Sequence, residues 1–122
     1  REIVVVTQNV DGLHQLAGAS DVVEIHGSLR RSRCMNSACV SEPFFDAFVP
    51  DSGAPEVPKC RVCGADLRPD ITLFNEALPL DALRRVKQFL RDCDLFLAIG
   101  TSGAVAPASE FVRGAAYAKA RT

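Results

Sequence analysis

Four of the five cysteines in this chain fall into two close pairs, Cys34 with Cys39 and Cys60 with Cys63. A tight turn can aim the thiolates of such a pair at one point, and a second pair completes the tetrahedral set of four sulfurs that Zn²⁺ prefers. A proline before the second pair and a glycine after it are typical of the tight turn of a zinc ribbon. The pairs therefore predict a closed, structural zinc site.

The same pairs leave alternatives open, namely two disulfides, an iron–sulfur cluster, or small buried thiols that only pack. Disulfides are disfavoured because nothing in the sequence indicates secretion and cytosolic thiols stay reduced. Cys93 lies apart from both pairs in the apolar stripe of a predicted helix, and we expect it to be a buried structural thiol.

A chain of 122 residues, of which 48% are hydrophobic, fits one soluble globular domain with a small insertion. Its net charge of -1 gives no general attraction to nucleic acid or to a membrane, so we expect neither as a direct partner. No secretory leader or long apolar run is present, which favours a cytoplasmic location. The sequence opens without Met, and we expect it to be a piece of a longer protein.

The apolar pattern predicts strands that alternate with helices. We expect strands at residues 3–6, 22–25 and 94–99, a helical turn at 13–16, and helices at 81–92 and 107–119. Asp81 is the expected N-cap of the first long helix, and Pro107 the expected first residue of the second. Residues 3–6 and, within the last of these strands, 95–99 are apolar throughout, as in strands buried on both faces of a sheet. The fold class is therefore α/β with a parallel sheet.

The pattern weakens between residues 28 and 68, where prolines exclude any long regular element. We interpret 28–68 as the zinc-binding module, inserted into a discontinuous parallel-sheet portion formed by 1–27 and 69–122. Phe44, Phe45 and Phe48 are expected to form the small core of the module or to pack it against the larger portion. A core this small does not fold unaided, so loss of any one of the four paired cysteines should unfold the module.

Three polar segments follow the predicted strands and should meet at one edge of the sheet, where open α/β sheets bind ligands. The first holds Gln8, Asn9 and Asp11, whose amides and carboxylate suit sugar hydroxyls or a carboxamide. The second holds His26, in the position of a proton acceptor. The third, residues 100–102, offers backbone N–H groups and hydroxyls for phosphate or ribose oxygens.

Each segment also has a purely structural interpretation. Asp11 and Gly12 are also typical of a simple turn, with Asn9 capping the helical turn that follows. A histidine after a strand often has only a structural role, and His14 in the helical turn is interpreted as a structural or capping group. The segment 100–102 alone is a weak signal, because the three spaced glycines of the dinucleotide fingerprint are absent.

Taken together, these residues resemble the sirtuins, a family of NAD-dependent protein-lysine deacylases. Residues 7–14 match the family signature TQNxDGLH, and 24–27 match E-(L/I)-H-G. Further matches are the two cysteine pairs, Arg68-Pro69 with Phe74 and Glu76 as in RPxxxxFGE, and Gly100-Thr101-Ser102 as GTS. The resemblance covers essentially the whole chain and implies a partial Rossmann-like sheet with an inserted zinc-ribbon module.

The resemblance implies a role for each matching residue. Gln8, Asn9 and Asp11 would hold the nicotinamide and its ribose, and His26 would be the general base. Gly100, Thr101 and Ser102 would contact the phosphate and ribose region of NAD. Zn²⁺ would be bound by Cys34, Cys39, Cys60 and Cys63, remote from the reaction. An acyl-lysine peptide would add as an extended strand between Phe74, Asn75 and Glu76 on one side and the segment with Gly103 and Val105 on the other.

The implied reaction removes an acyl group, of the deacetylase type, from lysine and yields nicotinamide and O-acyl-ADP-ribose. Asn75 departs from the family by replacing a glycine, although Asn also tolerates left-handed backbone. The family's glycine-rich GAG segment and its last strand are not in this sequence, so we expect this chain alone to bind NAD poorly. The alternative, from another class, is a catalytically silent, zinc-stabilised scaffold domain.

Overall fold

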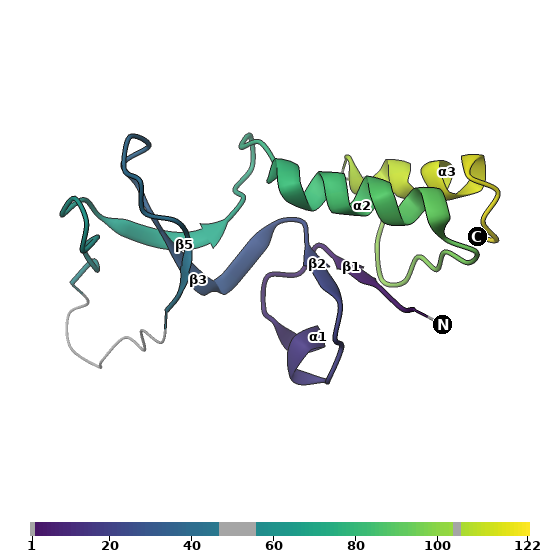
Figure 1. The fold of residues 1–122 in the computed structure, drawn as a ribbon, viewed down its shortest axis with the longest axis horizontal. Coiled ribbons are helices and arrows are strands. Elements are labelled where there is room, and N and C mark those ends of the chain that lie inside the picture. The colour runs from purple at the N-terminus through teal and green to yellow at the C-terminus, as the bar shows by residue number, and fades with distance from the viewer. Residues whose placement is uncertain (1, 47–55, 104–105) are drawn as a thin grey trace.

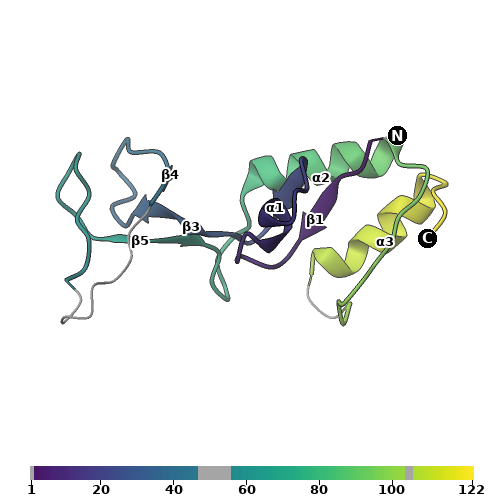
Figure 2. The same ribbon diagram turned by 90° about the horizontal axis from the view of Figure 1, so that it is seen from below.

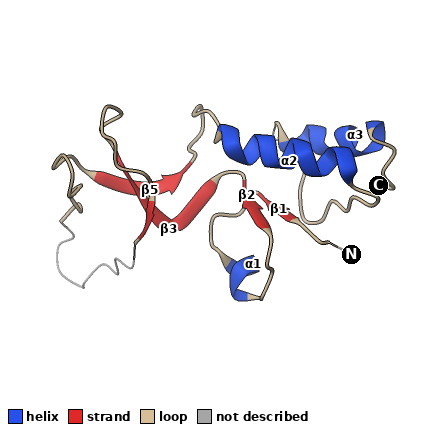
Figure 3. Cartoon of the chain, in the orientation of Figure 1, coloured by secondary structure: helices blue, strands red, loops and turns tan. Residues whose placement is uncertain are grey.

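The computed structural model describes residues 2–46, 56–103 and 106–122. The chain is elongated: a three-stranded sheet occupies one end and two helices the other, with a pair of parallel strands beside the helices (Figure 1). Figure 3 shows the same separation of strands and helices. Within the described residues, no helix is long and apolar enough to span a membrane.

The parallel strands are β1 (Val5–Thr7) and β2 (Val22–Glu24), paired from Val5↔Val22 to Thr7↔Glu24. A short helix, α1 (Leu13–Leu16), lies in the connection between them. Because the strands are parallel, the segments after Thr7 and after Glu24 leave from the same edge. The predicted α/β class with a parallel sheet is confirmed, and so is the placement of these two loops together.

The main core forms where α2 (Leu80–Asp92) covers this strand pair. Ala82 and Val86 of the helix are buried together with Val23 and Ile25. The last helix, α3 (Ala108–Tyr117), packs beside α2, as both views show (Figure 2). Both helices were predicted from their apolar periodicity, and both are confirmed.

The predicted helix starts are wrong in detail. Pro79 occupies the N-cap position of α2, and Asp81 instead lies in the first turn, where the helix dipole favours a carboxylate. Pro107 occupies the N-cap position of α3 rather than its first helical position. Proline needs no amide partner at either position, which explains why both are tolerated there.

The predicted strand at 94–99 is not formed. Its residues make one isolated parallel bridge, Leu95↔Arg121, and Leu97 and Ile99 are 67% and 84% exposed. A strand requires a hydrogen-bonded neighbour along its length, and the described part of the chain places only Arg121 beside it. The apolar run is therefore extended chain without a sheet.

The second sheet has the strand order β4–β3–β5, all antiparallel, and consists of β4 (Phe44–Phe45), β3 (Gly27–Cys34) and β5 (Leu67–Ile71). The expectation of no long element between 28 and 68 is wrong for β3. The prolines on which it rested begin at Pro43, beyond β3, and antiparallel partners on both sides stabilise this polar strand. Phe44 and Phe45 are 40% and 79% exposed rather than forming a core, and Phe48 lies outside the described residues.

Truncation of the core beneath α2 gives a measurable test of this packing. Val86 is 1% exposed, whereas Val112 on α3 is 38% exposed. We expect Val86→Ala to lower the free energy of unfolding by about 2 kcal/mol, since it removes two buried methyl groups and leaves a cavity. Val112→Ala has the same change in helix propensity and should cost less than about 1 kcal/mol. Equal losses in urea unfolding would contradict the assigned core.

Candidate functional site

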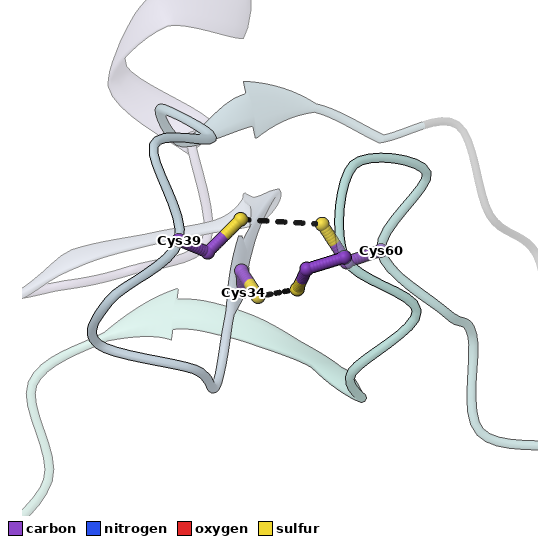
Figure 4. Close-up of side chains that lie close together, drawn as sticks. Cys34, Cys39 and Cys60 are labelled. Carbon is purple, nitrogen blue, oxygen red and sulfur yellow. Dashed lines mark hydrogen bonds between the residues drawn. The ribbon is translucent and has the colours of Figure 1, made fainter.

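The two cysteine pairs come together at the end of the β4–β3–β5 sheet. Their four Sγ atoms all lie within 4.8 Å of one another. The shortest approaches cross between the pairs: Cys34 lies 3.5 Å from Cys63, and Cys39 lies 3.8 Å from Cys60 (Figure 4). Four thiolates bound to one zinc ion at about 2.3 Å are separated by about 3.8 Å in a tetrahedron. The cluster therefore fits Zn²⁺ in both ligand type and size.

The local backbone stabilises thiolate at the second pair. Backbone N–H groups of Cys63 and Val62 lower the pKa of the Cys60 thiol to about 6. The N–H of Ala65 likewise lowers the pKa of Cys63. Burial raises the pKa of the Cys34 thiol instead, and the pKa of Cys39 is also raised. Metal binding requires deprotonated sulfur, so the first pair would release its protons when a metal ion binds.

All five cysteines are free thiols, so the disulfide alternative finds no support. Cys93 lies outside the cluster and donates to the Leu90 carbonyl at 3.6 Å. It is partly rather than fully buried, which corrects the expected burial of this thiol.

At the other predicted site, three segments far apart in the sequence meet in space. His26 Nδ1 lies 3.1 Å from the carbonyl oxygen of Gln8. The side-chain amide of Gln8 in turn donates to the hydroxyl of Thr101 at 3.1 Å. One chain of contacts thus joins the loop after β1, the end of β2 and the segment 100–102, the three segments that the sequence predicted to meet.

The loop after β1 is held by two short-range bonds. The Thr7 hydroxyl accepts the N–H of Asn9 at 3.0 Å, and the Asp11 carboxylate accepts the N–H of Leu13 at 3.0 Å. The side chain that accepts a hydrogen bond from the start of α1 is therefore that of Asp11, and not that of Asn9, which was the expected capping residue. Thr7 is 8% exposed and was missed as a positioning residue, although its place at the end of a buried strand was a usable signal.

Gly27 fixes how closely the segment after His26 approaches β5. Its φ is 81°, and a Cβ there would lie 2.0 Å from the carbonyl oxygen of Asp70. Only glycine fits both the backbone conformation and the contact. The His26 carbonyl also accepts the N–H of Thr72 at 2.9 Å, so His26 is anchored on both sides.

The predicted peptide-binding segment is held by a charged cluster. Glu76 accepts from Arg68 at 2.7 Å and from the N–H of Leu73 at 2.9 Å, and it pairs with Arg33 at 3.4 Å. Asn75 has a φ of 69°, the left-handed conformation that an Asn tolerates in place of Gly. Phe74 beside it is 95% exposed.

Two further observations complete the placement of the predicted residues. Gly100, Ser102 and Gly103 are exposed next to Thr101, whose hydroxyl accepts the N–H of Gly103 at 3.3 Å. Val105 lies outside the described residues. Arg33 was missed because its partner, Glu76, is distant in sequence, and no local pattern marks that pairing.

The Arg68–Glu76 contact predicts a pH dependence of stability. Hydrogen bonds from Arg68, followed by that from Leu73, hold the pKa of Glu76 below its ordinary value of 4.5. Ionised Glu76 therefore stabilises the fold above that value, and the contribution is lost as pH falls through the lowered pKa. We expect Glu76→Gln to destabilise the zinc-loaded protein at neutral pH, and the difference from wild type to shrink on acidification.

Urea unfolding of both proteins across this pH range measures the difference. Glu110→Gln is the matched control, because Glu110 pairs with Arg113 on the exposed face of α3. A difference between wild type and Glu76→Gln that stays constant down to low pH would contradict the assignment.

Comparison with known proteins places this geometry in a family. The model of the Sir2 family matches residues 1–107. The chain is 45% identical over 106 residues to an NAD-dependent protein deacylase of Aquifex aeolicus, covering 86% of this chain and 42% of that protein. It is 46% identical over 118 residues to NAD-dependent protein deacylase 2 of Pyrobaculum aerophilum, covering 96% and 45%.

Solved structures agree. A crystal structure of a Sir2 homologue in complex with NAD superposes with a TM-score of 0.86 at 36% identity, over 97% of this chain and 44% of that one. A Sir2 complex with a p53 peptide and NAD⁺ gives a TM-score of 0.81 at 31% identity, over 97% and 48%. The chain thus spans less than half the length of these relatives. The matched residues and the shared fold show that this chain belongs to the Sir2 family.

Proposed function

We propose that this chain is the zinc-stabilised central part of an NAD-dependent protein-lysine deacylase. One observation carries the proposal: the contacts that join His26, Gln8 and Thr101 at the edge where the strands end. A scaffold domain has no need of a histidine, an amide and a hydroxyl gathered at one exposed edge. The names of the relatives, NAD-dependent protein deacylases, support the same activity for the whole protein.

The contact at Nδ1 determines which nitrogen of His26 can act as a base. A carbonyl oxygen only accepts hydrogen bonds, so the Gln8 carbonyl requires the proton of a neutral His26 to sit on Nδ1. Nε2 is then the free acceptor. His26 is in this way oriented, by a backbone group that does not titrate, to take a proton from a ribose hydroxyl.

The neighbouring groups supply binding. Gln8, Asn9 and Asp11 would hold the nicotinamide and its ribose, with the loop set by Thr7. Gly100, Thr101 and Ser102 would contact the ribose and phosphate region, through exposed N–H groups and hydroxyls. NAD would supply the ribose carbon that the acyl oxygen of the substrate attacks as nicotinamide leaves. His26 would accept the proton of the ribose hydroxyl that takes up the acyl group, and one water would be consumed as free lysine and O-acyl-ADP-ribose are formed.

The acylated substrate would bind as an extended strand between residues 74–76 and 103–105. The cluster of Arg68 and Glu76 fixes the turn that presents the exposed Phe74. A relative bound to a p53 peptide supports a peptide substrate for this chain.

We also propose the domain division: an NAD-binding portion of Rossmann type formed by 1–27 and 69–122, and a zinc module at 28–68. The separation of the β1–β2 pair from the β4–β3–β5 sheet supports it. Zinc bound by Cys34, Cys39, Cys60 and Cys63 would hold the far end of the second sheet and take no part in the reaction.

The test is release of nicotinamide from NAD by the full-length protein, with and without a set of acyl-lysine peptides. We expect release that depends on an acylated peptide, and free lysine formed in equal amount. The unacylated peptides are the control. Zinc-loaded, folded protein that releases no nicotinamide with any acyl-lysine peptide would overturn the proposal and favour a silent scaffold.

A further inference from the structure

The outer surface between α2 and α3 contains a groove that the proposed reaction does not use. Its volume is about 580 Å³, and it is lined by residues of these two helices and of the turn after α3. None of its lining residues belongs to β1, to β2 or to the segments that carry the proposed NAD site.

One wall of the groove is basic. Arg84, Lys87 and Arg91 recur at intervals of three and four residues along α2, so they lie on the same face. All three are exposed, and none forms an ion pair within the described part of the chain. No acidic residue lines the groove. Three unneutralised cations therefore face one open space.

The neighbouring Arg85 shows the contrast. It pairs with Asp21 at 2.6 Å and lies 5.8 Å from the centre of the Phe89 ring, so it is committed to the fold. Arg84, Lys87 and Arg91 form no ion pair of this kind within the described residues.

The floor and rim of the groove are apolar. Leu90, Gly114 and Ala118 line the apolar part, where α3 and α2 are in contact: a Cβ at Gly114 would lie 3.4 Å from a methyl group of Leu90. Tyr117 stands at the rim and is 93% exposed. A largely unburied tyrosine beside apolar surface is typical of protein interfaces, where its ring packs and its hydroxyl stays wet.

We propose that this groove binds an acidic polypeptide segment that carries an apolar anchor residue. Carboxylates of the segment would pair with Arg84, Lys87 and Arg91, and the anchor would pack on Leu90 against Tyr117. From Arg84 to Arg91 the helix rises about 10 Å, the length of about two helical turns of a partner. Such a segment would contact both the basic wall and the apolar floor of the groove.

Nucleic acid uses only half of these features. Its phosphates would meet the cations, but they gain nothing from an apolar floor, and the whole chain has a net charge of -1. The groove therefore favours an acidic protein partner, and nucleic acid becomes an outcome of the test.

The probe is a short fluorescein-labelled peptide of glutamate and leucine at helical spacing, titrated into the full-length protein at physiological ionic strength. We expect saturable binding that is lost when the glutamates are replaced by lysine, and weakened when the leucines are replaced by serine. Lys87→Glu should weaken binding by about tenfold, because it reverses a charge at the centre of the wall. Tyr117→Ser, at an exposed position, should weaken binding without affecting the fold.

Arg61→Glu is the matched control, since Arg61 is an exposed cation in the turn between Cys60 and Cys63 and does not line the groove. It should change the affinity by less than about twofold. No saturable binding, or equal loss in Lys87→Glu and Arg61→Glu, would overturn the proposal. Equally tight binding of a DNA duplex that displaces the peptide would also overturn it, in favour of nucleic acid. Nicotinamide release by Lys87→Glu should equal that of wild type.

Discussion

Replacing Cys60 with alanine is expected to abolish tight zinc binding and to unfold the β4–β3–β5 end of the chain. Cys60 is 4% exposed and lies 3.8 Å from Cys39, so its sulfur is central to the cluster. The described residues at this end hold little apolar core: Phe45 is 79% and Val62 is 63% exposed. Structural zinc contributes on the order of 10 kcal/mol or more to small folds of this kind. The hydrophobic contacts of the described residues at this end are too few to replace that amount.

The matched control is Cys93→Ala, the same substitution at the cysteine that lies outside the cluster. We expect wild type and Cys93→Ala to bind one zinc per chain, and Cys60→Ala to bind none tightly. Hydrogen exchange should show loss of protection in β3 and β5, while α2, which packs on β2, keeps its protection. Full zinc occupancy with unchanged protection in Cys60→Ala would contradict the assigned role of the cluster.

Features set by local pattern were predictable from the sequence. The helices α2 and α3 follow from the apolar periodicity of residues such as Val86 and Phe111, which both face the core. The cysteine cluster follows from close spacing within each pair. Its cross-paired geometry, with Cys34 nearest Cys63, depends on how β3 and β5 pair and could not be predicted from spacing.

Features set by long-range pairing were not predictable. β3 is polar and has no strand pattern of its own, and it forms because β5 and β4 flank it. Residues 94–99 have a strong strand pattern, yet they form no strand, since hydrogen-bonded neighbours decide whether extended chain becomes a sheet. Propensity describes a residue's suitability for a sheet and does not supply its partner.

The candidate site lies between these cases. The loops with Gln8 and His26 could be placed because the parallel strands β1 and β2 end at one edge. Thr101 also lies beside Gln8, as expected, although residues 94–99 before it form no strand. The role of the Gln8 backbone carbonyl was not predictable, because carbonyl groups are common to all residues and leave no mark in a sequence. The environment of Glu24 was not predictable either: its Oε1 is buried without a hydrogen-bond partner in the described residues, and no sequence pattern indicates this.

Replacing His26 with alanine in the full-length protein is expected to lower NAD-dependent deacylation by about a hundredfold or more. This is the contribution usual for a positioned general base. His14→Ala is the matched control, because His14 is the only other histidine of this chain and lies in α1, outside the contacts of Gln8 and Thr101. It should leave turnover close to wild type. Equal turnover of His26→Ala and wild type would remove His26 from the mechanism.

A second readout separates a base from a residue that merely supports the loop. If His26 takes its proton after nicotinamide has left, then exchange of labelled nicotinamide into NAD, measured with an acyl-lysine peptide present, should survive in His26→Ala far better than deacylation does. A structural defect would lower both alike, because Gln8 contacts His26 through its backbone and Thr101 through its side chain, and a collapsed loop would lose NAD itself. The ratio of exchange to deacylation therefore distinguishes the two roles, and a ratio equal to that of wild type would assign His26 to holding the loop.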